Sequence, residues 1–273
     1  ICVYPFYYIF INTISDNKLS ERGAVVWFPQ GIHFQNYIDA FKIPNIANAA
    51  FISVARTVVG TVLIVIVSAF LGYMFTSATM WKKKFWYRFI IATMYFNAGI
   101  IPWYLTMMNL GLVNNFLGYI LPLIVSPFYI ILSKTYIESL GMEVREAAEV
   151  DGAGTLTLFW RIIIPVSKPI MSTIAIFAAV GQWNAFQDTL LLMTREKLFT
   201  LQFILYRYLQ SSSSLSAIVN ASSGSGAALA AQAQTQTSIR MTVTIIVALP
   251  ILLVYPFFQR FFVKGIMIGA VKG

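Results

Sequence analysis

Long runs of apolar residues constrain the fold of this chain more than any other feature of its sequence. A helix that crosses a bilayer needs about 20 predominantly apolar residues. Runs of that length occupy residues 49–75, 86–108, 116–134, 170–193 and 239–263. Residues 1–14 are apolar but shorter, and we expect them to be the outer part of a first span, since no basic start or cleavage site of a signal peptide is visible. The sequence therefore predicts an all-α membrane protein with six transmembrane helices.

The composition agrees with a single membrane domain over residues 1–273. The chain is 58% hydrophobic and 11% charged, whereas soluble domains are about 25% charged. The net charge of +9 does not indicate nucleic acid, because Lys and Arg lie mostly beside the apolar runs. One cysteine, Cys2, cannot form an internal disulfide, and one histidine, His33, provides neither a metal cluster nor a catalytic triad.

Positive charges next to short loops predict the orientation in the membrane. Lys82, Lys83, Lys84 and Arg88 lie between the second and third spans, whereas residues 109–115 contain no Lys or Arg. The first of these loops is therefore expected in the cytoplasm and the second outside. By alternation, we expect residues 135–169, the tail after Arg260 and the N-terminus that precedes residue 1 in the cytoplasm. Arg56, near the outer end of the second span, is expected to extend to the lipid headgroups.

A charged, helix-forming stretch at about residues 138–169 is unusual in so apolar a chain, and it is predicted to be a water-facing hairpin that docks another protein. Small alanines allow close approach of a partner, a glycine suits the positive φ of a break between two short helices, and prolines redirect the chain. The pattern is Glu-Ala-Ala, three residues, Gly, nine residues, Ile, one residue, Ile-Pro. The residues assigned to docking are Glu146, Ala147, Ala148, Asp151, Gly152, Ile162 and Pro165.

Motifs for catalysis are missing from the sequence. The dipeptide Gly-Lys that ends a phosphate-binding loop does not occur, and neither does Gly-x-Ser-x-Gly or His-Glu-x-x-His. We therefore expect no ATP site, no catalytic residue and no metal on this chain, and an energy source on another polypeptide.

Polar groups within the fifth span are the candidates for a solute pathway, because such groups in a membrane helix are costly unless they face the bundle interior or a wet cavity. With the spacing of one continuous helix, Gly181, Asn184 and Asp188 share a face. Amides and a carboxylate beside an indole suit sugar recognition; packing between helices is the alternative, and Asp188 could also be wetted from outside. Asn97, close to Gly99 and Pro102 in the third span, marks either a cavity or a simple kink. The pathway candidates are Gln182, Trp183, Asn184, Gln187, Asp188 and Asn97.

Two long segments are predicted outside the membrane. Residues 15–48 include a possible amphipathic helix around Phe34–Phe41, and residues 194–238 end in a stretch rich in Ser, Gly, Ala and Gln. That stretch has too few large apolar residues to form a core. It is either a tether or a loop that contacts an extracytoplasmic partner, and its small residues suit a narrow cleft. The contact candidates are Ser223, Gly224, Ser225 and Gly226.

The hairpin pattern resembles the coupling loop of ABC importer permeases, with Ile164 in place of the family's Leu. Gly181-x-Trp183-Asn184 resembles the carbohydrate-uptake group that contains the maltose permease MalG. Further resemblances to that group are Asp151–Ala153, Ile164–Pro169, Tyr255–Phe257, Phe262–Gly265 and Gly269–Gly273. Residues 95–105 are similar to the branch named for LplC and YtcP, which includes permeases for alginate and other plant or algal oligosaccharides.

The resemblance implies a type I importer permease in a bacterial cytoplasmic membrane. Its expected partners are a second, homologous permease in a heterodimer, two ATPase subunits that carry ATP and Mg, an extracytoplasmic solute-binding protein and an oligosaccharide. A permease for a non-sugar solute is the first alternative. A secondary transporter or channel that needs no ATPase is the second, and an enzyme comes last.

Overall fold

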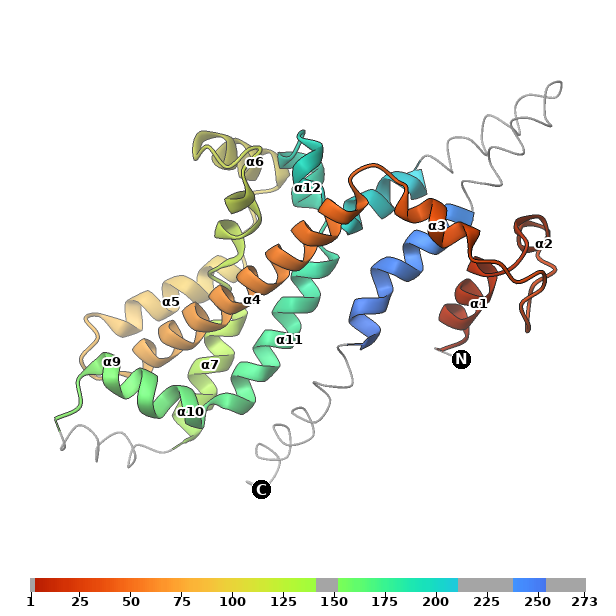
Figure 1. The fold of residues 1–273 in the computed structure, drawn as a ribbon. Coiled ribbons are helices and arrows are strands. Elements are labelled where there is room, and N and C mark those ends of the chain that lie inside the picture. The colour runs from red at the N-terminus through yellow and green to blue at the C-terminus, as the bar shows by residue number, and fades with distance from the viewer. Residues whose placement is uncertain (1–2, 141–151, 211–237, 254–273) are drawn as a thin grey trace. The chain divides into compact units, whose positions relative to one another are not determined.

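The structure is a computed structural model that describes residues 3–140, 152–210 and 238–253. Every regular element within these ranges is a helix (Figure 1), which confirms the all-α prediction. The residues assigned to the docking hairpin at 146–151 and to the external contact at 223–226 lie outside the described ranges.

Contacts within the chain divide it into two units. The first comprises Ile1–Ser53 and Met193–Val254, and the second comprises Val54–Leu192 and Tyr255–Gly273. The assignment of the whole chain to one permease domain stays a prediction.

The first unit contains the predicted helix of the segment 15–48: α3 covers Gln35–Phe41 and confirms it. A short helix before it is capped by the carboxylate of Asp16, which accepts hydrogen bonds from the backbone N–H groups of Lys18 and Leu19. The elements of this unit are α1 (Tyr4–Thr13), α2 (Asn17–Glu21), α3, the start of α4 (Ile46–Thr76), η4 (Glu196–Leu198), a helix over 201–210 and the helix Ser238–Leu253.

The second unit contains the rest of α4 and the shorter helices that pack around it. They are α5 (Lys83–Met94), α6 (Ile100–Asn109), η1 (Phe116–Tyr119), η2 (Leu121–Leu123), α7 (Pro127–Ser139), α9 (Thr155–Leu158), the π-helix η3 (Phe159–Ile163), α10 (Ile164–Val166), α11 (Lys168–Asn184) and α12 (Gln187–Leu192).

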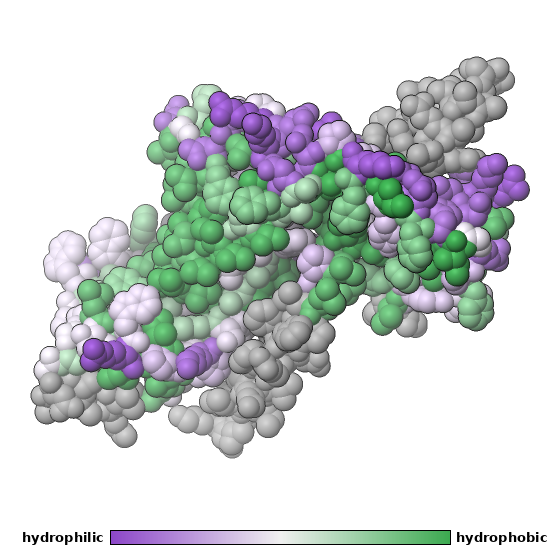
Figure 2. All heavy atoms as spheres, viewed as in Figure 1, coloured by the Kyte–Doolittle hydropathy of each residue, from purple (hydrophilic) through white to green (hydrophobic). Residues whose placement is uncertain are grey.

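Helix α4 has 31 residues and a length of about 46 Å, enough to cross a bilayer. Within the described residues it is the one helix that is long and apolar enough by itself; two bent helix pairs raise the number to three if each pair is one span. Val58 and Val62 of α4 are at least half exposed, and hydrophobic residues dominate the visible face along this helix (Figure 2). Such a surface suits lipid. The number of six spans stays a prediction.

Three of the predicted spans are interrupted, namely 86–108, 116–134 and 170–193. The run 86–108 is not one helix, because α5 and α6 are separated by residues 95–99, and Gly99 has a φ of 87° that other residues rarely adopt. The run 116–134 begins with two 3-10 turns, and the chain bends by 48° before α7. Pro127 lies in the first turn of α7, where its missing N–H leaves no hydrogen bond unmade.

Helices α4, α7 and α11 pack together in the core of the second unit (Figure 1). Ile64 of α4 and Ile174 of α11 belong to one buried cluster. Further along α4, Tyr73 joins Ile137 of α7 and Phe159 of η3 in a second cluster. The last turns of α4 therefore hold the segment that precedes α11.

Close approach of α4 to α7 depends on Gly72. A Cβ at this position would lie 2.6 Å from Ser133 Cβ and 2.9 Å from the backbone nitrogen of Lys134. We expect Gly72→Ala to lower the free energy of unfolding by about 1–3 kcal/mol, because one helix must move. Gly181→Ala is the matched control, since nothing lies within 4 Å of its added Cβ. Thermal unfolding of the purified transporter measures both, and equal midpoints for the two variants would contradict this packing.

Candidate functional site

The docking hairpin is described from Gly152 onward. Gly152 has a φ of 77°, which confirms the predicted positive φ. The helical run from α9 to α10 continues through Pro165 and ends at Val166, so Pro165 does not itself end the helix. The chain then turns by 81° into α11, with Pro169 in the first turn. The predicted change of direction is therefore confirmed.

The second arm of the hairpin, α9 to α10, is fixed to the helix bundle by aromatic contacts. The ring of Phe159 stacks on Tyr73 with 5.8 Å between centroids, and it meets Phe70 edge-on at 5.2 Å. Ile162 is half-buried and packs against the same cluster, whereas Pro165 is exposed. Phe159 therefore joins the arm to α4, and the motif isoleucine Ile162 packs against the same buried cluster. Sequence reasoning missed Phe159, which has no signal beyond its apolar character.

The fifth apolar run is broken at residues 185–186, between α11 and α12. Ala185 has a ψ of 128°, an extended conformation that ends the helix. The prediction that Asn184 and Asp188 share one helical face is therefore wrong, because they belong to different helices.

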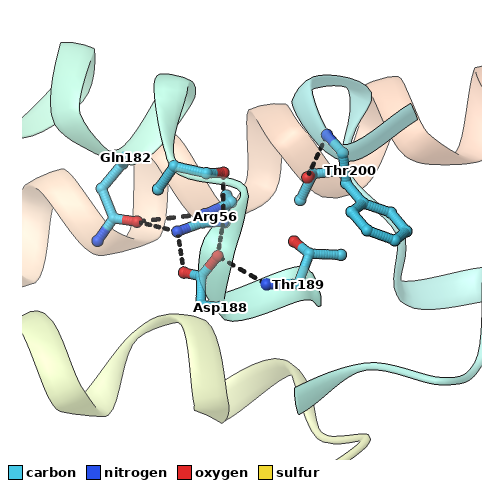
Figure 3. A network of polar contacts seen from close by, with 7 residues as sticks. Arg56, Gln182, Asp188, Thr189 and Thr200 are labelled. Carbon is cyan, nitrogen blue, oxygen red and sulfur yellow. Dashed lines mark hydrogen bonds and ion pairs between the residues drawn. The ribbon is translucent and has the colours of Figure 1, made fainter. Parts of the chain in front are cut away.

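Arg56 is buried, and the prediction that it extends to the headgroups is wrong. Its side chain is 1% exposed, and its Nη2 lies 2.6 Å from Oδ2 of Asp188, whose side chain is 12% exposed. The guanidinium also donates to Gln182 Oε1 at 3.0 and 3.2 Å, to Asp188 Oδ1 at 3.1 Å and to the Ala185 carbonyl at 3.2 Å (Figure 3). The break after α11 makes this possible, since it frees the Ala185 carbonyl from the helical ladder.

The ring of Tyr119 in η1 covers the guanidinium at 4.5 Å from its centroid, within the range of a cation–π contact. Asp188 Oδ1 accepts a further hydrogen bond from the backbone N–H of Thr189 at 2.8 Å (Figure 3). We call Arg56, Gln182, Ala185, Asp188 and Tyr119 the Arg56 network. One signal for this pair was present in the sequence. Arg56 and Asp188 are the single charges of two apolar runs, and buried charges are usually paired.

A hollow of about 570 Å³ opens beside this network in the second unit. Most of its lining is apolar, and its polar side chains come from the break at 95–99 and from both sides of the break at 185–186. We call it the polar hollow. It is lined by Asn97, Gly99, Ile100, Trp103, Leu123, Asn184, Ala185, Phe186, Gln187, Asp188, Leu190 and Leu191.

Four of the six pathway candidates line the polar hollow: Asn97, Asn184, Gln187 and Asp188. The side chains of Asn184 and Gln187 are exposed. The other two candidates are buried: Trp183 is 9% exposed. Gln182, 2% exposed, holds Arg56 and lies against Gly60, where an added Cβ would be 2.7 Å from its Nε2. For Gln182 the structure favours packing between helices, the alternative considered above.

Trp103, a lining residue that sequence reasoning missed, brings an indole to the polar hollow. It lies in α6, and the residues next to it in the sequence gave no sign that it would line a cavity. The interruption at 95–99 contributes Asn97 and Gly99 to the lining of the hollow, which agrees with the cavity interpretation of Asn97; its role in a solute pathway stays a prediction.

In the described part of the chain every regular element is a helix, one helix is long enough to cross a membrane, interrupted helices line a hollow, and a bent arm is fixed to the bundle. These features are typical of membrane transport components. The family described as "Binding-protein-dependent transport system inner membrane component" matches residues 71–268, and the chain belongs to this family. The resemblance to importer permeases is therefore confirmed.

Relatives with known names belong to the same class. Protein LplC of Bacillus subtilis (strain 168) is 33% identical over 274 residues, covering 100% of this chain and 90% of LplC. The polygalacturonan/rhamnogalacturonan transport system permease protein YtcP of the same strain is 28% identical over 273 residues, covering 100% of this chain and 93% of YtcP. Both agree with the predicted branch.

The fold also matches a solved structure. A chain from a bacterial ABC transporter involved in the import of the acidic polysaccharide alginate superposes with a TM-score of 0.83 and 28% identity, covering 96% of this chain and 91% of the other. The chain therefore has the fold of an ABC importer permease.

Proposed function

We propose that this chain is the permease subunit of an ATP-driven importer that takes up oligosaccharides from an extracytoplasmic binding protein. The polar hollow carries the sugar assignment: the indole of Trp103 and the exposed amides of Asn184 and Gln187 line one cavity. Sugar hydroxyls need directional hydrogen bonds, and the apolar face of a sugar stacks on an aromatic ring. The names of the relatives, which concern polygalacturonan, rhamnogalacturonan and alginate, support a saccharide as the solute.

The family supports ATPase and solute-binding partners, and we propose the following assembly. This permease pairs with a homologous permease, and two cytosolic ATPases supply ATP hydrolysis with their own ATP and Mg, so that the permease itself is not an enzyme. Glu146, Ala147, Ala148 and Asp151 dock the hairpin on an ATPase. The hairpin's second arm supports this role, because Phe159 and Ile162 join it to α4. A movement of the ATPase then shifts the helix bundle from one of its two conformations to the other.

The hairpin and both termini face the cytoplasm in this proposal. Phe159 packs against Tyr73, one turn before α4 ends at Thr76. The basic residues Lys82–Lys84 follow directly in the chain, so the arm and the positive charges lie at the same end of α4. That arrangement agrees with the rule that positive loops stay inside.

The external segment beyond residue 210 is proposed to contact the binding protein through Ser223, Gly224, Ser225 and Gly226. Its composition supports entry into a narrow cleft. A simple tether is the competing role.

Transport by the complete complex tests the proposed function. We expect uptake of labelled oligosaccharide into proteoliposomes only when ATP, the ATPases and the solute-binding protein are all present. The ATPase rate should rise when the loaded binding protein is added, because its docking favours the ATPase-closed arrangement. Uptake without ATP, by a chain that purifies without an ATPase, would instead support a secondary transporter.

A further inference from the structure

The polar hollow lies next to a cation that no solute can reach. The guanidinium of Arg56 has five N–H groups, and the five hydrogen bonds given above, to Gln182 Oε1 twice, to both oxygens of Asp188 and to the Ala185 carbonyl, use all of them. The ring of Tyr119 covers one face of the group, and the side chain is 1% exposed. Arg56 is therefore a structural charge and offers no site for an anion.

In the described part of the chain, the lining of the hollow contains no cationic side chain. Its single charged residue is Asp188, whose negative charge is balanced by Arg56. The carboxylate of an incoming uronate would meet this carboxylate without a partner of its own. An anion that loses water without gaining a cation or sufficient hydrogen bonds is strongly disfavoured.

What the hollow does offer is neutral. The exposed amides of Asn184 and Gln187 make no hydrogen bond to any other described residue. Each amide supplies two donors and an acceptor, which pair with hydroxyl groups. Trp103 adds a half-buried aromatic surface that suits the C–H face of a sugar ring.

We infer that the polar hollow recognises an uncharged glycosyl unit and discriminates against uronate units. The inference rests on the proposed function, since it requires that this chain moves saccharides. It separates this chain both from the alginate importer and from YtcP, because alginate and polygalacturonan are built from uronate units.

The test compares two probes of equal linkage and length, a neutral oligogalactoside and an oligogalacturonide. Both are titrated against the complete transporter in nanodiscs without the binding protein, and quenching of tryptophan fluorescence is measured. The wild-type transporter should respond to the neutral probe at concentrations at least about tenfold lower than to the uronate.

Adding a cation to the hollow should reverse this preference. Asn184 is the last residue of α11, where a lysine is well tolerated because positive charge is favourable at a helix C-terminus. In Asn184→Lys and Gln187→Lys, the ratio of the two affinities should shift toward the uronate by about tenfold or more. Asn109→Lys is the matched control, an exposed asparagine at the end of α6 that does not line the hollow, and it should leave the ratio unchanged.

Two results would overturn the inference alone: a wild-type transporter that prefers the uronate, or lysine variants whose ratio equals that of the Asn109→Lys control. If neither probe changes the fluorescence and neither is taken up by the complete system with its binding protein, the proposed function fails as well.

Discussion

Arg56→Ala is expected to destabilise the transporter by about 3–5 kcal/mol, because removing one partner of a buried ion pair leaves the other charge uncompensated. The carboxylate of Asp188, whose side chain is 12% exposed, would lose both of its hydrogen bonds from the guanidinium and would keep only the one from the backbone N–H of Thr189 (Figure 3). Gln182 Oε1 would lose both of its hydrogen bonds from the guanidinium. The midpoint of thermal unfolding of the purified complex and the yield of membrane-inserted protein measure this loss.

Two further variants separate the ion pair from general sensitivity to mutation. Arg88→Ala removes an exposed arginine and should change the free energy of unfolding by less than about 1 kcal/mol. Arg56→Ala combined with Asp188→Ala removes both charges, so its effect should be smaller than the sum of the two single effects. A double variant whose effects simply add, or an Arg56→Ala variant as stable as Arg88→Ala, would contradict the buried pair.

Glu146→Lys is expected to abolish association with the ATPase while leaving insertion into the membrane intact. Five of the ten acidic residues lie between Glu138 and Asp151, so the receiving groove should offer basic or amide donors. A lysine at position 146 would lose its interactions with these donors, and we expect the permease to bind the ATPase more than about a hundredfold more weakly. Co-purification with the ATPase and ATP-driven uptake are the measurements. Glu21→Lys, which changes the net charge equally on α2, should behave as wild type.

Gly152 allows a second test of the hairpin with a matched control. Nothing lies within 4 Å of an added Cβ at Gly152 or at Gly154, but Gly152 has a φ of 77° and Gly154 a φ of −67°. A valine is strained only at the first of these. Coupling, measured as ATP-driven uptake, should therefore fall in Gly152→Val and persist in Gly154→Val. Equal coupling in both variants would show that the left-handed break is not needed for docking.

The amino-acid sequence by itself determined the class of fold and the main features of the hairpin. Long apolar runs admit only helices in a bilayer, because every backbone group must be paired within its own segment. Local chemistry was equally informative at Gly152, where the lack of a Cβ permits the positive φ that the structure has. The spacing of the hairpin motif identified the family. The motif residues are close together in the chain, so the motif can be recognised without the tertiary structure.

Only the tertiary structure decided which residues form the polar hollow. Alanine is the best helix former, so nothing local predicts that the helix ends at Ala185. That break directs Gln182 and Trp183 into the protein and places Asn184 and Gln187 in the hollow. The carbonyl it frees, together with Asp188, binds Arg56, a residue 132 positions away in the chain. Such a pairing is set by how the helices pack. The buried guanidinium is stabilised by several acceptors that only this packing brings within reach, so no local sequence pattern could indicate it.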